Sequence, residues 1–127
     1  MDTKEIRYLF GGRLVGNNFM KEIVCETVSS LPQEIIEYLT KRVWIMSSDS
    51  EAWAFTFTGN DLKDKHLIFL SDELLSEDKS QIQFTLLHEI GHVILGHKNS
   101  INYKQTKSEV NKQEREANKF ARKYLGI

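Results

Sequence analysis

Two histidines and a glutamate stand close together in the stretch TLLHEIGHVILGH. His88 and His92 are four residues apart, so on an α-helix their side chains lie about one turn apart on the same face. Two imidazoles at this spacing can bind one Zn²⁺ ion, while Glu89 points at a water molecule in the open coordination position. Zinc lowers the pKa of such a water to about 7 and polarises a carbonyl group, and the glutamate moves the proton. The motif therefore predicts hydrolysis of a peptide bond.

The rest of this segment is apolar on almost every side of the expected helix. Between residues 84 and 95 the polar side chains are confined to one strip, which holds Thr85, His88, Glu89 and His92. Burying imidazoles and a carboxylate without partners costs several kcal/mol, and a metal bound in a cleft removes that cost. The helical context thus favours a metal site over a chance occurrence of the motif.

A catalytic zinc needs a third protein ligand, and the position of that ligand separates the known arrangements. The metzincin extension requires a glycine at position 95 and a histidine at position 98, where this chain has Leu95 and Lys98. Gly96 and His97 are each displaced by one position. We interpret Gly96 as the end of the helix and His97 as a surface histidine or one that supports a metal ligand.

The segment QEREANKFARKYL near the C-terminus offers two carboxylates as the third ligand. On a helical wheel Glu114 falls at the border of the apolar face, between Ala121 and Leu125, whereas Glu116 falls at the edge of the basic, solvent-facing arc. Because an unpaired carboxylate at the edge of a core is costly, Glu114 is the preferred ligand and Glu116 is the alternative. Asn118, one turn further on, could accept the N–H of a ligand imidazole.

The remaining pattern predicts the elements that must position these residues. After a short opening segment, helices are expected from Asn17 or Asn18 to Val28 and from Pro32 to Arg42. Strands are expected at 43–46, 52–58 and 66–70, with the last one central because it is continuously apolar. Gly59 and Asn60 mark a turn, the aromatic side chains, including Trp44 and Trp53, are assigned to the core, and His66 is given a structural role.

Two capping boxes predict where the last two helices begin. Ser80 with Gln83 would start the motif helix, and Thr106 with Glu109 would start the final helix, which ends near Leu125 with Gly126 beyond it. Helices, then a small sheet, then helices indicate an α+β fold in a single domain, residues 1–127.

Composition excludes several classes of protein. The chain has 127 residues, 40% of them hydrophobic and 28% charged, which is ordinary for a soluble globular domain. Cys25, the only cysteine, is expected to be a reduced core thiol. The sequence shows no signal peptide or membrane span, so a cytoplasmic location is expected. A net charge of −1 predicts no direct binding of nucleic acid, and the basic C-terminal segment is interpreted as a solvated helix face.

The stretches FTLLHEIGHVILGH and EREANKFA resemble the ImmA/IrrE family of zinc metallopeptidases, which have a gluzincin arrangement of ligands. The likeness covers about residues 66–125. It implies a zincin-like domain with a small, mostly antiparallel sheet, in which His88, His92 and Glu114 bind Zn²⁺, with Mn²⁺ as the alternative metal, and Glu89 is the general base. Thermolysin-type gluzincins have an aspartate where this chain has Asn118.

The resemblance also implies a substrate, since members of that family often cut a helix-turn-helix repressor and so switch on genes of a mobile element or a stress response. The first hypothesis is an intracellular zinc endopeptidase that binds an extended protein segment along an exposed sheet edge. Tyr103 and His97 are candidate donors to the transition-state oxyanion. The alternative is a non-catalytic binding module that sequesters a regulatory protein, but such a module would not need Glu89.

Overall fold

A four-stranded sheet forms one layer of the fold. The computed structural model describes residues 1–48, 54–57, 65–97 and 106–127. The strand order is β1-β2-β4-β3, with bounds of Leu14–Val15 (β1), Val43–Ser48 (β2), His66–Ser71 (β4) and Ala54–Phe57 (β3). The β1–β2 and β2–β4 pairs are parallel, and only β3 runs antiparallel to its neighbour β4.

The α+β class is confirmed, but the expectation of a mostly antiparallel sheet was wrong. After β2 the chain forms β3 at the far edge of the sheet and then forms β4 between β2 and β3. Strands β2 and β4 therefore run parallel. The strand expected to be central is β4, and it does lie between β2 and β3. The predicted turn at Gly59 and Asn60, and the side chain of Trp53, lie outside the described residues.

Three helices come from the N-terminal part of the chain: α1 (Thr3–Phe10), α2 (Asn18–Ser29) and α3 (Gln33–Arg42). The second and third agree with the predicted helices, with Asn17 and Pro32 as their N-caps. Helix α1 was not predicted, although its start carries a usable signal. The side chain of Asp2 accepts a hydrogen bond from the backbone N–H of Glu5 at 2.8 Å, the geometry of an N-cap.

The other helices are α4 (Asp72–Leu75), α5 (Lys79–Ile94) and α6 (Lys107–Leu125). Helix α5 carries the motif of two histidines and a glutamate, but its N-cap lies two residues before the predicted one. Asp78 is its N-cap and accepts from the backbone N–H of Gln81 at 2.9 Å, so the expected role of Ser80 was wrong. For α6 the prediction is confirmed, because Thr106 caps its start and Gly126 follows its end with a φ of 84°.

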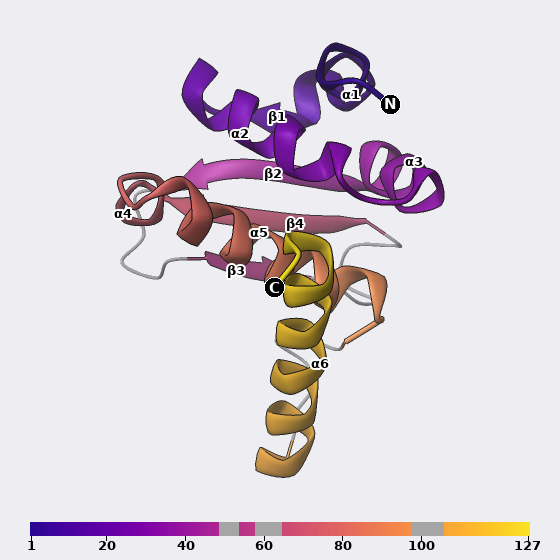
Figure 1. Ribbon diagram of the computed structural model, residues 1–127, viewed down its shortest axis with the longest axis vertical. Helices are drawn as coiled ribbons and strands as arrows, with labels where there is room; N and C mark the ends of the chain where they lie inside the picture. The colour runs from indigo at the N-terminus through magenta and orange to yellow at the C-terminus, as the bar shows by residue number, and fades with distance from the viewer. Residues whose placement is uncertain (49–53, 58–64, 98–105) are drawn as a thin grey trace.

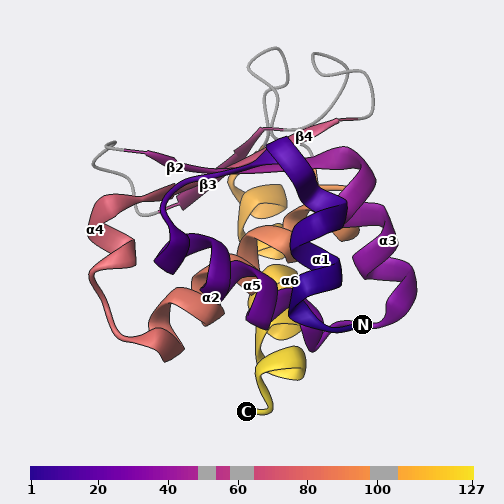
Figure 2. The ribbon, with the colours of Figure 1, turned by 90° about the horizontal axis from the view of Figure 1, so that it is seen from above.

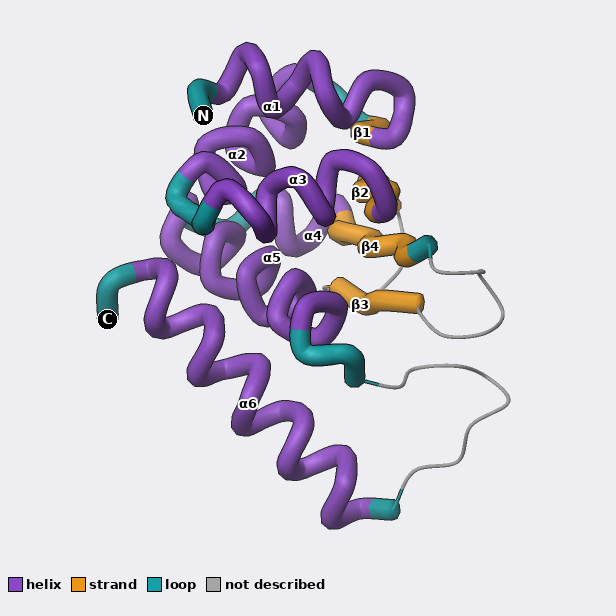
Figure 3. Tube along the Cα trace, turned by 90° about the vertical axis from the view of Figure 1, so that its right-hand side faces the viewer, coloured by secondary structure: helices purple, strands orange, loops and turns teal. Residues whose placement is uncertain are grey.

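The helices lie on one side of the sheet, as Figures 1 and 2 show, and Figure 3 shows α6 alongside α5 at the edge of the molecule nearest β3. The hydrophobic core lies between the two layers and includes Ile45, Ile68 and Leu70 from the sheet. Trp44, which was assigned to the core, is 38% exposed because it points to the face of the sheet away from the helices. The thiol of Cys25 is buried, as expected.

No helix within the described ranges has the length and apolar character needed to cross a membrane.

Candidate metal centre

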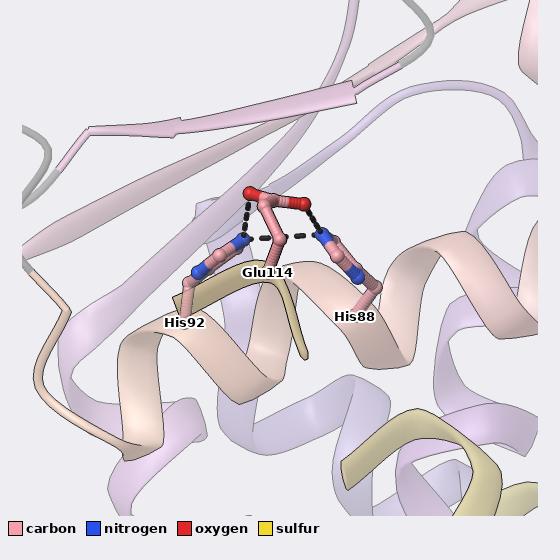
Figure 4. Close-up of side chains that lie close together, drawn as sticks. All are labelled: His88, His92 and Glu114. Atoms are coloured by element: carbon pink, nitrogen blue, oxygen red, sulfur yellow. Dashed lines mark hydrogen bonds and ion pairs between the residues drawn. The ribbon is translucent and has the colours of Figure 1, made fainter. Parts of the chain in front are cut away.

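Three side chains from two helices converge on one point beside α5. The Nε2 atoms of His88 and His92 are 3.1 Å apart. From α6, the Glu114 carboxylate places one oxygen 3.0 Å from Nε2 of His88 and the other 3.2 Å from Nε2 of His92 (Figure 4). Among the described residues these three side chains form the one cluster of histidine, cysteine or acidic groups that could hold a metal ion.

The chemistry of these donor atoms fits a divalent cation. Nδ1 of His88 lies 2.7 Å from Oδ1 of Asn118, and an amide oxygen can only accept, so the proton of this ring is on Nδ1. In the neutral form of this ring Nε2 has a lone pair that faces the Glu114 carboxylate, an arrangement that a cation between the two, a proton or a metal ion, would relieve. A tetrahedral ion with bonds of about 2.0–2.1 Å would hold its ligand atoms about 3.3 Å apart, close to the distances seen here.

Close packing of α5 on α6 brings Glu114 to the two histidines. Gly91 lies between the two histidines in the sequence of α5, and a Cβ atom added there would lie 3.2 Å from Cβ of Phe120 and 3.3 Å from Cα of Ala117. A larger residue at position 91 would push α6 away. The sequence I-G-H thus places a predicted metal ligand next to the small residue that lets the partner helix approach.

Glu114 meets the histidines, but the reason given for preferring it over Glu116 was wrong. The Glu114 side chain is 50% exposed and that of Glu116 is 43% exposed, so the cost of burial does not distinguish them. Their contacts do, because Glu116 reaches His97 instead of the two motif histidines. Periodicity placed Glu114 on the side of α6 that faces α5, and that placement is what matters.

His92 is in the form that can bind a metal. Burial is the main effect on the ring, and together with the neighbouring charge of His88 it lowers the pKa of His92 from 6.5 to about 4. The imidazole is therefore neutral at neutral pH in the metal-free chain. A neutral ring offers the lone pair that a metal requires.

Glu89 is buried next to this cluster and is not one of its three converging donors. Its side chain is 7% exposed, and Oε2 accepts a hydrogen bond from the hydroxyl of Thr56 on β3 at 2.7 Å. Burial is the largest effect and raises the pKa of Glu89, while the Thr56 hydrogen bond and the charge of His88 oppose the rise. Perturbed carboxyl groups of this kind are common where a side chain must move protons.

The sequence pattern missed the contribution of Thr56. The aromatic side chains of this strand, Phe55 and Phe57 among them, were assigned to the core, yet Thr56 between them is 1% exposed and faces the helix layer. The side chains of the two phenylalanines lie outside what the structure describes. A threonine between two aromatic residues at a sheet edge gives no local signal of a partner 33 positions away.

His97 supports a predicted ligand and is buried, with 7% of its surface exposed. Its Nδ1 lies 2.8 Å from Nδ1 of His92, and its Nε2 lies 3.2 Å from a carboxylate oxygen of Glu116. The structure thus rules out a surface position for His97 and places its ring against His92, whereas its role as a donor to an oxyanion stays a prediction. Tyr103, the other candidate donor to an oxyanion, lies outside the described residues.

Comparison with known protein families shows a likeness to a family of peptidases. The family model described as Peptidase U49 matches residues 79–126, which span α5, α6 and the segment between them. No curated protein and no solved structure matches the chain. The match covers more than a third of the chain and includes the three converging side chains and Glu89. Thr56, the partner of Glu89, lies outside it. It supports a proteolytic function, and the chain is therefore similar to a family of peptidases in the region where its ionisable side chains converge.

Proposed function

We propose that the chain is a zinc-dependent intracellular endopeptidase whose metal ligands are His88, His92 and Glu114. The observation that carries the proposal is Glu89, a buried carboxylate beside the three converging donors. A structural metal site would have no use for it, because closed structural sites need four protein ligands and no base. The family match over α5 and α6 supports the same class of reaction.

In this proposal the residues of the chain act on a water molecule and a peptide bond. Zn²⁺, when bound, would lower the pKa of the water and polarise the peptide carbonyl, and Mn²⁺ could do the same. Glu89 takes a proton from the attacking water and delivers it to the amide nitrogen that leaves. Thr56 holds one oxygen of Glu89 by a hydrogen bond, so the other oxygen is left for the water. Asn118 keeps the proton of His88 on Nδ1.

The substrate is proposed to be a protein segment in extended conformation. Strand β3 is the last strand of the described sheet, and the contact between Thr56 and Glu89 brings it against α5. A peptide paired with that edge would lie above the motif helix and present a backbone carbonyl to the metal centre. The resemblance to ImmA/IrrE peptidases makes a helix-turn-helix repressor the proposed natural substrate.

The test co-expresses the chain with helix-turn-helix repressors from its own genome, starting with any that a neighbouring gene encodes. The wild-type chain should release a defined fragment. Glu89→Gln should still bind one equivalent of Zn²⁺ but cut about 10²- to 10⁴-fold more slowly, since a general base contributes that much. Glu73→Gln, the same change at an exposed glutamate of α4, should cut like the wild type.

Two results would contradict the proposal. Undiminished cleavage by Glu89→Gln would remove Glu89 from the mechanism. A stable complex with the repressor at saturating Zn²⁺, without any fragment, would instead support the binding module described as the alternative.

A further inference from the structure

A second set of hydrogen bonds leads away from the metal centre behind His92. On the side opposite the converging donors, Nδ1 of His92 meets Nδ1 of His97 at 2.8 Å. Nε2 of His97 in turn meets Oε1 of Glu116 at 3.2 Å. The order Glu116, His97, His92 thus runs from the surface of α6 to the metal position.

The backbone at the end of α5 is built to return His97 to His92. Gly96 adopts a left-handed conformation with a φ of 70°, which an L-residue with a side chain rarely tolerates. The N–H of His97 then donates to the carbonyl of His92 at 3.0 Å, and the N–H of Gly96 donates to the carbonyl of Val93 at 3.2 Å. This turn places the two imidazole rings edge to face, with centroids 5.1 Å apart.

The protons along this chain can be placed from its outer end. A carboxylate has no proton to donate, so Nε2 of His97 must donate to Glu116. In a neutral His97 the other nitrogen, Nδ1, is then a bare acceptor, and it must receive the N–H of Nδ1 of His92. The neutral His92 ring therefore has its lone pair on Nε2, which is the atom that faces His88 and Glu114.

We propose that Glu116 and His97 are positioning residues that hold His92 in its metal-binding tautomer. The two motif histidines obtain the same orientation by different means. His88 donates directly to the amide oxygen of Asn118, whereas His92 donates to a histidine that is itself oriented by a carboxylate. Residues in this position raise the basicity and fix the orientation of a metal-bound imidazole. The inference rests on the proposed metal site but on nothing about the substrate.

The first test measures Zn²⁺ affinity by competition with a chromophoric chelator. His97→Leu removes the acceptor and should weaken binding about 10- to 100-fold. His97→Asn should restore binding to within a few-fold, because its Oδ1 would give His92 the acceptor that Asn118 gives His88. The control is His66→Leu, which removes another buried histidine at the start of β4 and should leave the affinity unchanged. Equal affinity of wild type and His97→Leu would overturn the proposal.

The second test reads the tautomers of the metal-free chain at neutral pH from the ¹⁵N resonances of the histidine rings. We expect His97 to carry its proton on Nε2 and His92 to carry its proton on Nδ1. Glu116→Leu, a change at a half-exposed side chain, should convert His97 to a mixture of tautomers, whereas Glu116→Gln keeps an acceptor oxygen and should preserve the wild-type form. A wild-type His92 protonated on Nε2 would overturn the inference. Failure of the wild type to bind any divalent cation would instead refute the metal site, and the ¹⁵N measurement would still test the hydrogen-bonded chain.

Discussion

The three N-terminal helices and the α5–α6 pair bury their polar groups in different ways. In α2 and α3 the buried hydroxyls of Thr27 and Thr40 donate to carbonyls one turn back in their own helices, at 2.7 and 2.9 Å. In α5 the buried or half-buried polar groups instead meet residues from other elements. Glu89 reaches β3, and His88 reaches α6. The first region uses its interior for packing, and the second uses it to hold ionisable groups in fixed positions.

This difference implies that substitutions in the two regions should affect different properties. Packing residues should set the free energy of unfolding and leave the metal centre intact. The polar residues where α5 meets α6 should alter metal binding or catalysis, with a smaller effect on stability at neutral pH. The predictions below test that separation.

The largest expected loss of stability comes from the N-terminal layer. Leu39 of α3 is fully buried, so Leu39→Ala should lower the free energy of unfolding by about 2 to 5 kcal/mol, through lost burial and the cavity that remains. Urea unfolding in the presence of a chelator measures this loss. The affinity of Leu39→Ala for Zn²⁺, measured without urea while the variant is folded, should match that of the wild type. A substantial loss of affinity would show that the two regions are not separate.

The pH dependence of stability should come partly from His92. Its pKa is about 4 in the folded chain and 6.5 as a reference for the unfolded chain. Between these values the unfolded chain binds a proton that the folded chain does not, so the free energy of unfolding should fall as the pH drops from about 6.5 to 4. The fall due to this ring is at most about 3 to 4 kcal/mol.

Comparison with His92→Gln isolates that contribution, because the carboxyl groups titrate in both proteins. Urea unfolding at pH 7, 5.5 and 4.5 in chelator should give a steeper decline for the wild type than for the variant. Parallel curves would mean that His92 is not held neutral by its surroundings.

The smallest expected effect on stability comes from a matched pair of glycines. Gly91→Ala places a methyl group against Phe120 and Ala117, and overpacking offset by better helix propensity should leave a net cost of about 1 kcal/mol. Gly12→Ala meets no atom within 4 Å and should change stability by less than about 0.5 kcal/mol. Only Gly91→Ala should weaken Zn²⁺ binding, because only Gly91 packs against α6, the helix that carries Glu114. Equal affinities in the two variants would show that the spacing of α5 and α6 does not position Glu114.

Much of the region around the candidate metal centre could be predicted from the sequence because its determinants are local or periodic. The four-residue spacing of His88 and His92 fixes their shared face on any helix. The cap at Thr106 and the turn after Leu125 set the register of α6, and the register brings Glu114 and Asn118 toward α5. Even so, the choice of Glu114 was made on burial, and the structure shows a half-exposed side chain.

The features that the sequence did not reveal depend on contacts between distant segments. The parallel pairing of β2 with β4 depends on where β3 inserts, and no local pattern encodes that choice. The position of Thr56 beside Glu89 follows from the same sheet order. At the start of α5, Asp78 and Ser80 are both good capping residues, so propensity could not choose between them. Trp44 is exposed because helices cover only one face of the sheet.

Titration calorimetry of the purified chain with Zn²⁺ tests most directly whether His88, His92 and Glu114 hold one cation. The wild type should bind one equivalent, and Glu114→Gln should lose more than about 100-fold in affinity, since a lost ligand costs more than a lost support. Glu73→Gln makes the same change at an exposed glutamate of α4 outside the cluster, and it should stay within a few-fold of the wild type. Wild-type affinity in Glu114→Gln, or no binding by the wild type, would contradict the account.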